Sequence, residues 1–370
     1  MSSGDTFFIT GFPGLIASRL LALLAGTDSD FMLLVQPALI ARARKEIEEI
    51  ASESGRSVAD FEVIDGDIGE PNLGLSYSEL ESLRSRTSRV FHLAAVYDLA
   101  VPQDVALHVN VGGTHNVSEV VRTFPRLRQY HYVSTCYVAG KREGHILETE
   151  LRHEAGFRNF YEESKYLAEM GLESLKAELP ITIHRPAVVC GDSRTGETGK
   201  YDGVYYLIHY LLKWPSVLSQ LNIGNHEVSL NLVPVDFVVS ALARLAYDEA
   251  AIGKTVQLAD PRPLTTNQLF NAITGSINGA HSKITVPRSW VYFMLMLPPS
   301  PRITGLPHHA VPYFFVKQIY DSTQAQALLA PHGIICPPFV SYVDKIIDFA
   351  ARHPVIIPNI HPETPRYSEQ

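Results

Sequence analysis

The segment from residue 6 to residue 26 constrains the fold of this 370-residue chain more than any other. TFFITG has the composition of a short buried strand, and GFPGLIASRLLALLAG follows as a tight turn and a helix with leucines on one face. Gly11, Gly14 and Ala17 therefore stand at a junction between a strand and a helix. At such a junction the backbone can approach a pyrophosphate, which the helix N-terminus attracts. The segment predicts the start of a dinucleotide-binding fold.

Further strands alternate with helical stretches along the chain. FMLLVQ, residues 31–36, predicts a second strand, VIDGDIG a third that ends at Asp67 and Ile68, and VFHLAAVY, residues 90–97, a fourth. This alternation predicts an α/β fold: a doubly wound, parallel-sheet Rossmann domain whose ligand lies beyond the carboxyl ends of the strands. A smaller, mainly helical substrate domain is expected beside it.

The chain is expected to cross between these two units more than once. After Cys190 a glycine-rich loop, GDSRTGETGKYDG, leads to the helical stretch YYLIHYLLKW, and LNLVPVDFVVSALARLAYD then returns to the sheet. The predicted boundaries are 1–190 and 229–258 for the dinucleotide-binding domain, and 191–228 and 259–370 for the substrate domain.

Tyr161 and Lys165, in NFYEESKYLAEM, are spaced to share one helical face. Asn159 followed by Glu162 predicts a helix N-cap with a capping-box-like acid just before the tyrosine. An ammonium group in this position can lower the pKa of the phenol and help it exchange a proton with a substrate oxygen. Tyr313 and Lys317 have the same spacing, so the neighbouring sequence has to decide between the two pairs.

The preceding strand favours Tyr161. RQYHYVSTCYVAG alternates as a strand and ends in Ser134 and Thr135, hydroxyl groups that can share a substrate oxygen with the phenol. Tyr313 has no such strand before it. Cys136 adjoins Thr135, but alternation turns it to the opposite face, where a packing role is expected.

The cofactor's ribose is expected at the end of the second strand. Gln36 stands there, where an NAD site usually has Asp or Glu, and Arg42 and Arg44 follow shortly after. Arginine can bind a 2′-phosphate in a bidentate manner, so NADPH is the favoured cofactor and NADH the alternative. Both arginines can equally be solvated helix residues.

Several motifs in order resemble the extended short-chain dehydrogenases/reductases, in particular the thioester-reductase and fatty acyl-CoA reductase (male-sterility type) branch. The resemblance covers residues 6 to 350 and rests on these segments: TGFPGLIA, GDIGEPNLGLS, HLAAVYDL, NVGGTHNV, VSTCYVAG, NFYEESKYLAE, RPAVVCGDSRTGETGKYDG and LVPVDFV. It implies that Thr135, Tyr161 and Lys165 are catalytic and that Asn110 supports the lysine. It also implies that residues 186–189 line the nicotinamide.

The residues expected to contact the cofactor belong to the first turn, the strand ends and the catalytic helix. They are Gly11, Phe12, Pro13, Gly14, Leu15, Ile16, Gln36, Arg42, Asp67, Ile68, Leu93, Ala94, Ala95, Tyr161, Lys165, Pro186, Ala187, Val188 and Val189. No metal site is predicted, because the 15 histidines show no ligand-type spacing.

The resemblance implies an NAD(P)H-dependent reductase that transfers a hydride to a carbonyl, with an acyl thioester of coenzyme A or of an acyl-carrier protein as the favoured substrate and an aldehyde or alcohol as product. A ketone or hydroxysteroid-like reductase and a sugar-nucleotide epimerase remain alternatives, as does a non-catalytic cofactor-sensing protein on the same fold. Two departures matter. Gln36 stands where relatives in this branch often have arginine, and no adenylation or carrier domain precedes the reductase segment.

Composition agrees with these expectations. A formal charge of −8 disfavours a nucleic-acid partner, and three cysteines without paired spacing favour the reducing cytoplasm. The most apolar run, residues 290–297, is too short to span a bilayer. It can form core packing, the wall of an acyl groove or a peripheral membrane contact, and the sequence does not separate the three.

Overall fold

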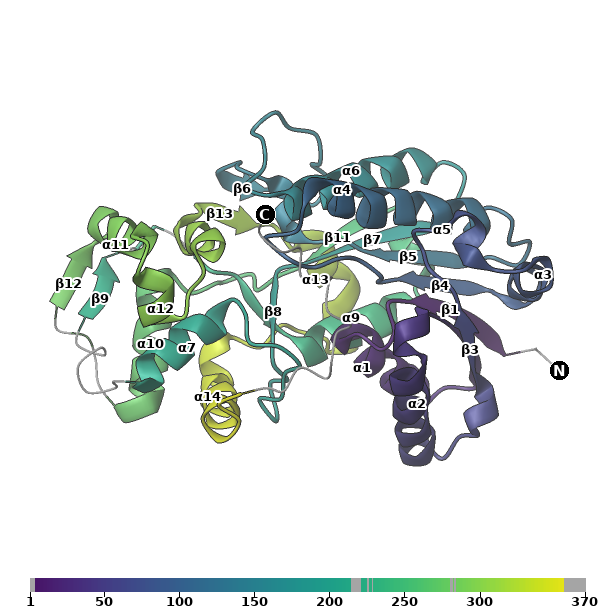
Figure 1. The fold of residues 1–370 in the computed structure, drawn as a ribbon, viewed down its shortest axis with the longest axis horizontal. Coiled ribbons are helices and arrows are strands. Elements are labelled where there is room, and N and C mark those ends of the chain that lie inside the picture. The colour runs from purple at the N-terminus through teal and green to yellow at the C-terminus, as the bar shows by residue number, and fades with distance from the viewer. Residues whose placement is uncertain are drawn as a thin grey trace.

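The computed structural model describes residues 4–213, 221–224, 226, 227, 229–279, 282 and 284–355. Its centre is a parallel sheet in the spatial order β11-β7-β5-β4-β1-β2-β3 (Figure 1). The strands are β1 (Asp5–Thr10), β2 (Ser29–Val35), β3 (Phe61–Asp65), β4 (Arg89–His92), β5 (Gln129–Val133), β7 (Ile181–Pro186) and β11 (Thr255–Leu258). The strand order reverses between β1 and β4, which is where a doubly wound sheet binds its ligand. The predicted α/β Rossmann fold is confirmed.

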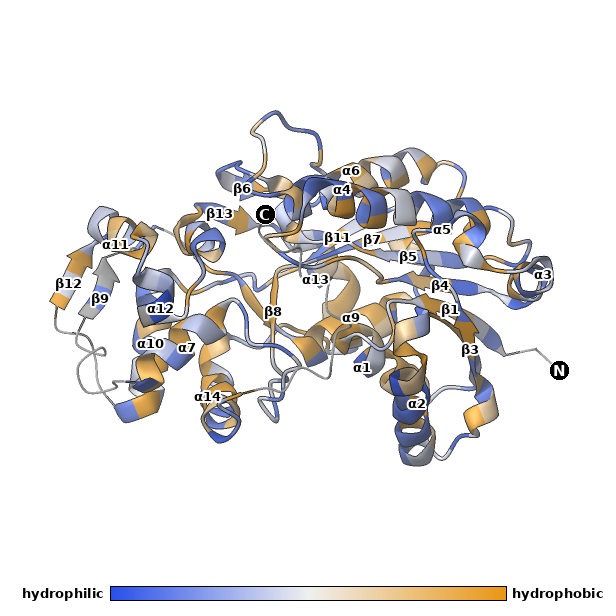
Figure 2. Ribbon diagram, in the orientation of Figure 1, coloured by the Kyte–Doolittle hydropathy of each residue, from blue (hydrophilic) through white to orange (hydrophobic). Residues whose placement is uncertain are grey.

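Helices cover both faces of this sheet because its strands are apolar on both sides (Figure 2). Phe7 and Ile9 pack with α1 (Leu15–Leu24), α2 (Ile40–Ser54), α9 (Val235–Leu245) and α13 (Thr323–Leu329). Phe8, on the alternate face of β1, packs in the cluster that includes residues of α3 (Tyr77–Arg86), α5 (Gly113–Val121) and α6 (Phe160–Leu175). Figure 1 shows these two helical layers on opposite sides of the sheet.

Two strands end earlier than the sequence predicts. β3 ends at Asp65, so Asp67 and Ile68 lie in the loop after it, and β4 ends at His92 rather than Tyr97. The chain leaves the sheet after His92 because other groups bind its backbone. The amide of Ala94 donates to Thr10 Oγ1 at 3.2 Å, and Asn110 binds both the N–H and the C=O of Val96.

A second, smaller unit lies beside the carboxyl side of the sheet (Figure 1). Its apolar cluster includes Ile208, Leu269, Phe314 and Ile346. The helices around it are α7 (Val204–Lys213), α10 (Thr266–Asn278), α11 (Arg288–Met296), α12 (Ser300–Thr304) and α14 (Val343–Arg352). Two-stranded parallel sheets join β8 (Val188–Cys190) to β10 (Leu232–Pro234), β9 (Leu221–Gly224) to β12 (Ile284–Pro287), and β6 (Gly144–Ile146) to β13 (Gln318–Tyr320).

Short helices complete the described chain. They are α4 (Gln103–Ala106), the π-helix η4 (Leu107–Gly112), and the 3-10 helices η1 (Pro37–Leu39), η2 (Val58–Asp60), η3 (Pro71–Gly74), η5 (Cys136–Ala139), η6 (Glu249–Ala251), η7 (His308–Phe315), η8 (Ala330–His332) and η9 (Phe339–Ser341).

The proposed domain division stays a prediction. Tyr320, Ala325 and Leu328 pack in the apolar cluster of the large sheet, although the division assigns them to the substrate domain. The segment that follows residue 259 therefore packs against both units. Residues 356–370, which the division also includes, lie outside the described residues.

The apolar run at residues 290–297 forms α11, which lies with β12 at the end of the smaller unit farthest from the sheet (Figure 1). Val291 and Leu295 pack against the smaller unit's cluster, whereas Trp290 and Phe293 are 66% and 61% exposed. Core packing therefore accounts for only part of this run. Over the described ranges, the chain forms no helix with the length and apolar character that a bilayer crossing requires.

Candidate active site

The helix that carries Tyr161 and Lys165, the predicted catalytic residues, begins where the sequence predicts. Asn159 caps α6 by accepting a hydrogen bond from the amide of Glu162 at 3.0 Å, which places Tyr161 in the first turn. The carboxylate of Glu162 accepts from the amide of Arg158 at 2.9 Å rather than from the N-cap amide, so the capping box is a variant of the expected one. Tyr161 is buried, and its position is fixed by an ordered helix start.

Thr135 meets Tyr161 at the carboxyl end of β5. Thr135 lies close enough to Tyr161 to oppose the effect of burial on the pKa of Tyr161. Thr135 Oγ1 accepts from the amide of Tyr137 at 3.2 Å. Its neighbours point elsewhere. Ser134 donates to Glu169, and Cys136 Sγ donates to the carbonyl of Arg185 at 3.1 Å within the core. Of the two hydroxyls at the strand end, Thr135 is therefore the one beside the phenol.

Lys165 lies one turn after Tyr161 and is almost completely buried. Its ammonium donates to the carbonyl of Val133 at 2.8 Å and lies 4.3 Å from the ring centroid of Tyr132. Burial lowers the pKa of Lys165 to about 7. Burial also raises the pKa of Tyr161 well above its usual range, so the lowering that the sequence led us to expect is outweighed in this structure.

Asn110 reaches the catalytic helix from the π-helix η4. Its Nδ2 donates to Ser164 Oγ at 2.9 Å, and its Oδ1 accepts from the amide of Val96 at 2.9 Å. Asn110 thus ties the segment after β4 to the residue that precedes Lys165. Its contact with the lysine is indirect, and π-helical turns of this kind are frequent at functional sites.

The turn between β1 and α1 is shaped for close approach of a ligand. Gly11 has φ +89°, and a Cβ there would lie 2.7 Å from the amide nitrogen of Ala94. A Cβ on Gly14 would lie 2.7 Å from the carbonyl oxygen of Gly11, and Gly14 caps α1 without a side-chain hydrogen bond. The first turn of α1 carries no acidic residue. A pyrophosphate fits such a turn, because the helix N-terminus favours an anion and the turn leaves the backbone open.

Two of the residues predicted to contact the cofactor are hydrogen-bonded to each other. Gln36 Nε2, at the end of β2, donates to Asp67 Oδ2 at 2.9 Å. Asp67 also accepts from the amide of Gly69 at 2.8 Å, and Ile68 lies next to it in the same loop. A carboxylate therefore stands beside Gln36, although the sequence has none at position 36 itself.

The two arginines after β2 differ in their surroundings. Arg42 Nη2 donates to the carbonyl of Pro13 at 2.8 Å, in the same turn as Gly11 and Gly14, and its Nε lies 3.9 Å from Glu46. Arg44 is exposed on α2. The structure thus brings Arg42, but not Arg44, to the glycine turn.

The remaining predicted contacts gather at the same edge of the sheet. Residues 93–95 follow β4 and cross the glycine turn. Pro186 is the last residue of β7, and residues 187–189 lead from it into β8. The amide of Ala187 donates to Leu258 O at 3.0 Å and that of Val188 to Asn231 O at 3.0 Å, so this backbone is fixed from β11 and β10. Phe12, Pro13, Leu15 and Ile16 lie in the turn and first helical residues between β1 and α1. All these positions remain predicted contacts.

The second tyrosine and lysine pair is not arranged as a pair. Tyr313 lies in the 3-10 helix η7, which ends before Lys317, and Lys317 binds Glu227 at 2.6 Å. The hydroxyl of Tyr313 donates to Glu162 Oε1 at 2.6 Å instead. Tyr313 therefore contacts the start of the catalytic helix and does not form a separate centre.

Sequence reasoning missed two side chains next to Tyr161. Tyr97 stacks edge-on against Tyr161 with ring centroids 5.1 Å apart. Burial, together with the charge of Asp202, raises the pKa of both tyrosines. Tyr97 falls in the segment predicted as strand, and Asp202 ends a glycine-rich loop about a hundred positions later. No local pattern links them, because only the fold brings them together.

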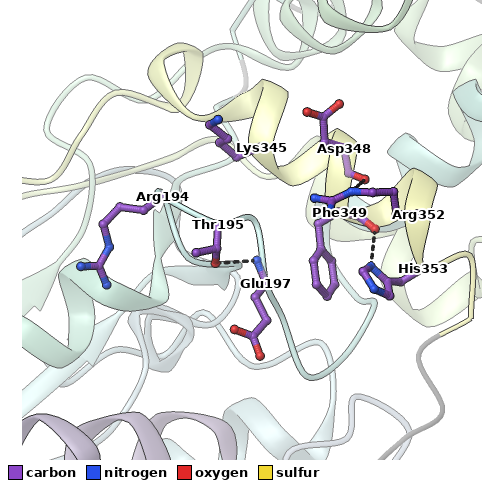
Figure 3. A pocket seen from close by; sticks show the side chains of 8 residues that line it. All are labelled: Arg194, Thr195, Glu197, Lys345, Asp348, Phe349, Arg352 and His353. Atoms are coloured by element: carbon purple, nitrogen blue, oxygen red, sulfur yellow. Dashed lines mark hydrogen bonds between the residues drawn. The ribbon is translucent and has the colours of Figure 1, made fainter. Parts of the chain in front are cut away.

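An open pocket of about 390 Å³ lies between the GDSRTG loop and α14 (Figure 3). It is lined by Arg194, Thr195, Glu197, Lys345, Asp348, Phe349, Arg352 and His353. None of the predicted site residues is among them. Gly196 seats the loop on α14, since a Cβ there would lie 2.0 Å from the carbonyl oxygen of Lys345.

Comparison with known proteins places the chain in a family. The NAD-binding family model described as "Male sterility protein" matches residues 9–242. The chain belongs to this family. It is an extended short-chain dehydrogenase/reductase of the thioester-reductase and fatty acyl-CoA reductase branch, as its motifs indicated.

Curated relatives are distant and longer. The chain is 25% identical to glycine betaine reductase ATRR of Emericella nidulans over 73% of its own length and 22% of that protein. It is 26% identical to fatty acyl-CoA reductase wat of Drosophila melanogaster over 51% of its length and 41% of that protein. The chain thus spans less than half the length of these relatives.

Among solved structures, the terminal R domain from the myxalamid PKS-NRPS biosynthetic pathway superposes with a TM-score of 0.80. The two chains are 24% identical, and the match covers 96% of this chain and 92% of that domain. This similarity supports the fold. Within the described residues, no group of three or more His, Cys, Asp or Glu side chains is arranged to hold a metal ion.

Proposed function

We propose that this protein reduces the carbonyl of an acyl thioester with NADPH. The observation that carries the proposal is the placement of Thr135 beside Tyr161 at the carboxyl edge of the sheet, with Lys165 one helical turn away and the glycine turn at the same edge. The family of the chain and the reductases among its relatives support the thioester as substrate.

The cofactor would be held by the turn at residues 11–16 and by Lys165, and it supplies the hydride. Thr135 and Tyr161 would hydrogen-bond the carbonyl oxygen, and Tyr161 would give its proton to the oxyanion that develops there. The resulting hemithioacetal then breaks its carbon–sulfur bond, and its hydroxyl proton passes to the departing sulfur. The products are an aldehyde and a free thiol. A second hydride would give the alcohol.

NADPH is favoured over NADH in this proposal. Arg42 lies at the glycine turn, bound to the carbonyl of Pro13, and its guanidinium can add a bond to a 2′-phosphate. Asp67 beside Gln36 is the opposing feature, because a carboxylate favours a free ribose hydroxyl. The relative strength of the Arg42 and Asp67 contacts determines whether NADPH or NADH binds more tightly.

The thiol carrier would be coenzyme A or an acyl-carrier protein. The terminal R domain that shares this fold comes from the myxalamid PKS-NRPS biosynthetic pathway, and fatty acyl-CoA reductase wat is named for a coenzyme A ester. A peripheral membrane contact through the exposed residues of α11 and a cytoplasmic location remain predictions.

The experiment is to follow free thiol and NADPH loss together across a series of acyl-CoAs, with ketones and UDP-sugars as parallel substrates. We expect free thiol and NADP⁺ to appear together when at least one of the thioesters is reduced. If an alkyl chain is bound, each methylene adds up to ~0.8 kcal/mol, so affinity rises several-fold for each two-carbon extension. Cofactor oxidation on a ketone or sugar, with no thiol released from any thioester, would instead support the ketone reductase or epimerase.

A further inference from the structure

Two consecutive residues at the carboxyl end of β5 are bound to two positions one turn apart on α6. The carbonyl of Val133, the last residue of β5, accepts from Lys165 Nζ at 2.8 Å. The hydroxyl of Ser134, the next residue, donates to Glu169 Oε2. Lys165 and Glu169 are four residues apart and therefore share one face of the helix. These contacts fix the position of the chain just before it reaches Thr135.

Glu169 is also bound from a third element. Its Oε1 accepts from Arg185 Nε at 2.8 Å and from Arg185 Nη2 at 2.6 Å. Arg185 lies on β7, directly before residues 186–189, which are predicted to line the nicotinamide. Ser134 and Arg185 thus occupy the two oxygens of one carboxylate, and this carboxylate joins the ends of β5 and β7 to α6.

This group of side chains is closed off from solvent. Glu169, Arg185 and Ser134 are 0%, 1% and 5% exposed. Arg185 Nη1 donates to the carbonyl of Glu150 at 3.0 Å, and the carbonyl of Arg185 accepts from Cys136 Sγ at 3.1 Å. Removing two charges from water costs free energy that their attraction often only offsets, so a buried ion pair is weak evidence for a role in stability. A role in fixing geometry accounts for it better.

We propose that Glu169 is a positioning residue: by binding Ser134 and Arg185 together, it sets the ends of β5 and β7 against the helix that carries Tyr161. The inference rests on the function proposed above, because it concerns the geometry of that reaction. Glu169 acts through its two partners, one on each strand end.

The strand ends matter because predicted site residues follow them directly. Thr135 comes after Ser134, and residues 186–189 come after Arg185. The register between β5 and β7 ends at Val133, and beyond it the amide of Ser134 donates once more to the β7 backbone, at 2.7 Å. The side-chain bond to α6 is therefore the contact that relates this segment to the helix. A displacement of about 1 Å between reacting groups can lower a rate roughly a hundredfold.

The first test removes the bond between β5 and α6 and leaves the ion pair in place. In Ser134→Ala we expect kcat on a reducible thioester to fall about tenfold or more, with the affinity for NADPH little changed. Ser118→Ala is the matched control, because Ser118 is 2% exposed and its hydroxyl donates to the carbonyl of Thr114 at 2.7 Å within α5. Both variants lose a buried hydroxyl and should lose similar stability, but only Ser134→Ala should lose kcat.

The second test removes the carboxylate and keeps the core filled. The double variant Glu169→Leu with Arg185→Met replaces the buried ion pair by apolar side chains, a change that is often neutral or stabilising. We expect it to resist urea as well as the unsubstituted protein and yet to lose about tenfold or more in kcat. Full activity in a stably folded double variant, or an unchanged kcat in Ser134→Ala, would overturn the proposal. If the double variant does not fold, Ser134→Ala decides the question.

A measurement without substrate separates this inference from the proposed function. A ring-fluorinated tyrosine at position 161 reports its own surroundings through its fluorine NMR resonance. This resonance should shift in Ser134→Ala and in the double variant, and it should stay in place in Ser118→Ala. Shifted resonances without turnover on any thioester would contradict the proposed function and leave the positioning role intact. Turnover of a thioester with unshifted resonances would do the reverse.

Discussion

The hydroxyl of Tyr313 donates a 2.6 Å hydrogen bond to Glu162 in the first turn of the catalytic helix. Asn159, the N-cap of that helix, donates to the same hydroxyl at 2.7 Å. Tyr313 comes from the smaller unit, so a residue of that unit stabilises the helix start that positions Tyr161. A tyrosine that mimics the catalytic spacing thus has a structural role in the site.

Tyr161→Phe should nearly abolish turnover and leave cofactor binding largely intact, because it removes the proton donor and keeps the ring. Tyr313→Phe should retain substantial turnover and lose about 1–2 kcal/mol of unfolding free energy, since Glu162 and Asn159 each lose a buried partner. Steady-state kinetics and urea unfolding of both variants check this. The site would be wrongly assigned if the Tyr161→Phe variant were active while the Tyr313→Phe variant folded stably but was inactive.

Gly11→Ala should abolish binding of NADPH, because the new Cβ would lie 2.7 Å from the amide nitrogen of Ala94. Gly55→Ala is the matched control, as Gly55 also has a positive φ, +70°, but no atom lies within 4 Å of the added carbon. Both variants should lose about 1 kcal/mol of stability from the strained backbone. Fluorescence titration with NADPH distinguishes them, and equal affinities in the two variants would contradict a cofactor site at this turn.

Arg42→Met should weaken NADPH binding roughly tenfold and affect NADH much less, because a charged contact to the 2′-phosphate is lost. Arg44→Met, on the exposed face of α2, should change neither affinity. Titration of each variant with both cofactors gives the result. An equal loss for NADH and NADPH would show that Arg42 only supports the turn through the carbonyl of Pro13.

Lys165→Met should inactivate the enzyme and stabilise the free protein. The pKa of Lys165 is about 7 in the folded protein, against about 10.4 in the unfolded chain. Burying the ammonium therefore lowers the free energy of unfolding at and below neutral pH. That cost falls as pH rises from 7 toward 10. The variant should therefore gain on the order of 2 kcal/mol near pH 7 and little near pH 10.

Urea unfolding at both pH values measures this difference, with Lys45→Met as the control. The side chain of Lys45 is 79% exposed, so its variant should show no such dependence on pH. A stability difference for Lys165→Met that stays constant between neutral and alkaline pH would refute the assignment of a buried, destabilised ammonium.

The dinucleotide-binding fold and the helix that carries Tyr161 and Lys165 could be predicted from local sequence features. The junction at Gly11 and Gly14, the N-cap Asn159 and the spacing of Tyr161 and Lys165 are local features, set by backbone conformation, capping and helical periodicity within a few residues. Alternation of strands and helices then fixed the parallel sheet, whose carboxyl edge collects the predicted positions. The family assignment agrees with these features.

Local sequence features do not predict which side chains surround the phenol of Tyr161 or how that phenol ionises. Strand ends depended on distant partners, as β4 stops where Asn110 and Thr10 bind the following backbone. Tyr97 packs against Tyr161 from a distant part of the chain, and Tyr313 reaches Glu162 from another unit. Burial then reverses the direction expected for the phenol's pKa. The physical reason is that long-range contacts and desolvation depend on the packing of the whole chain, whereas sequence patterns record only what neighbouring residues impose.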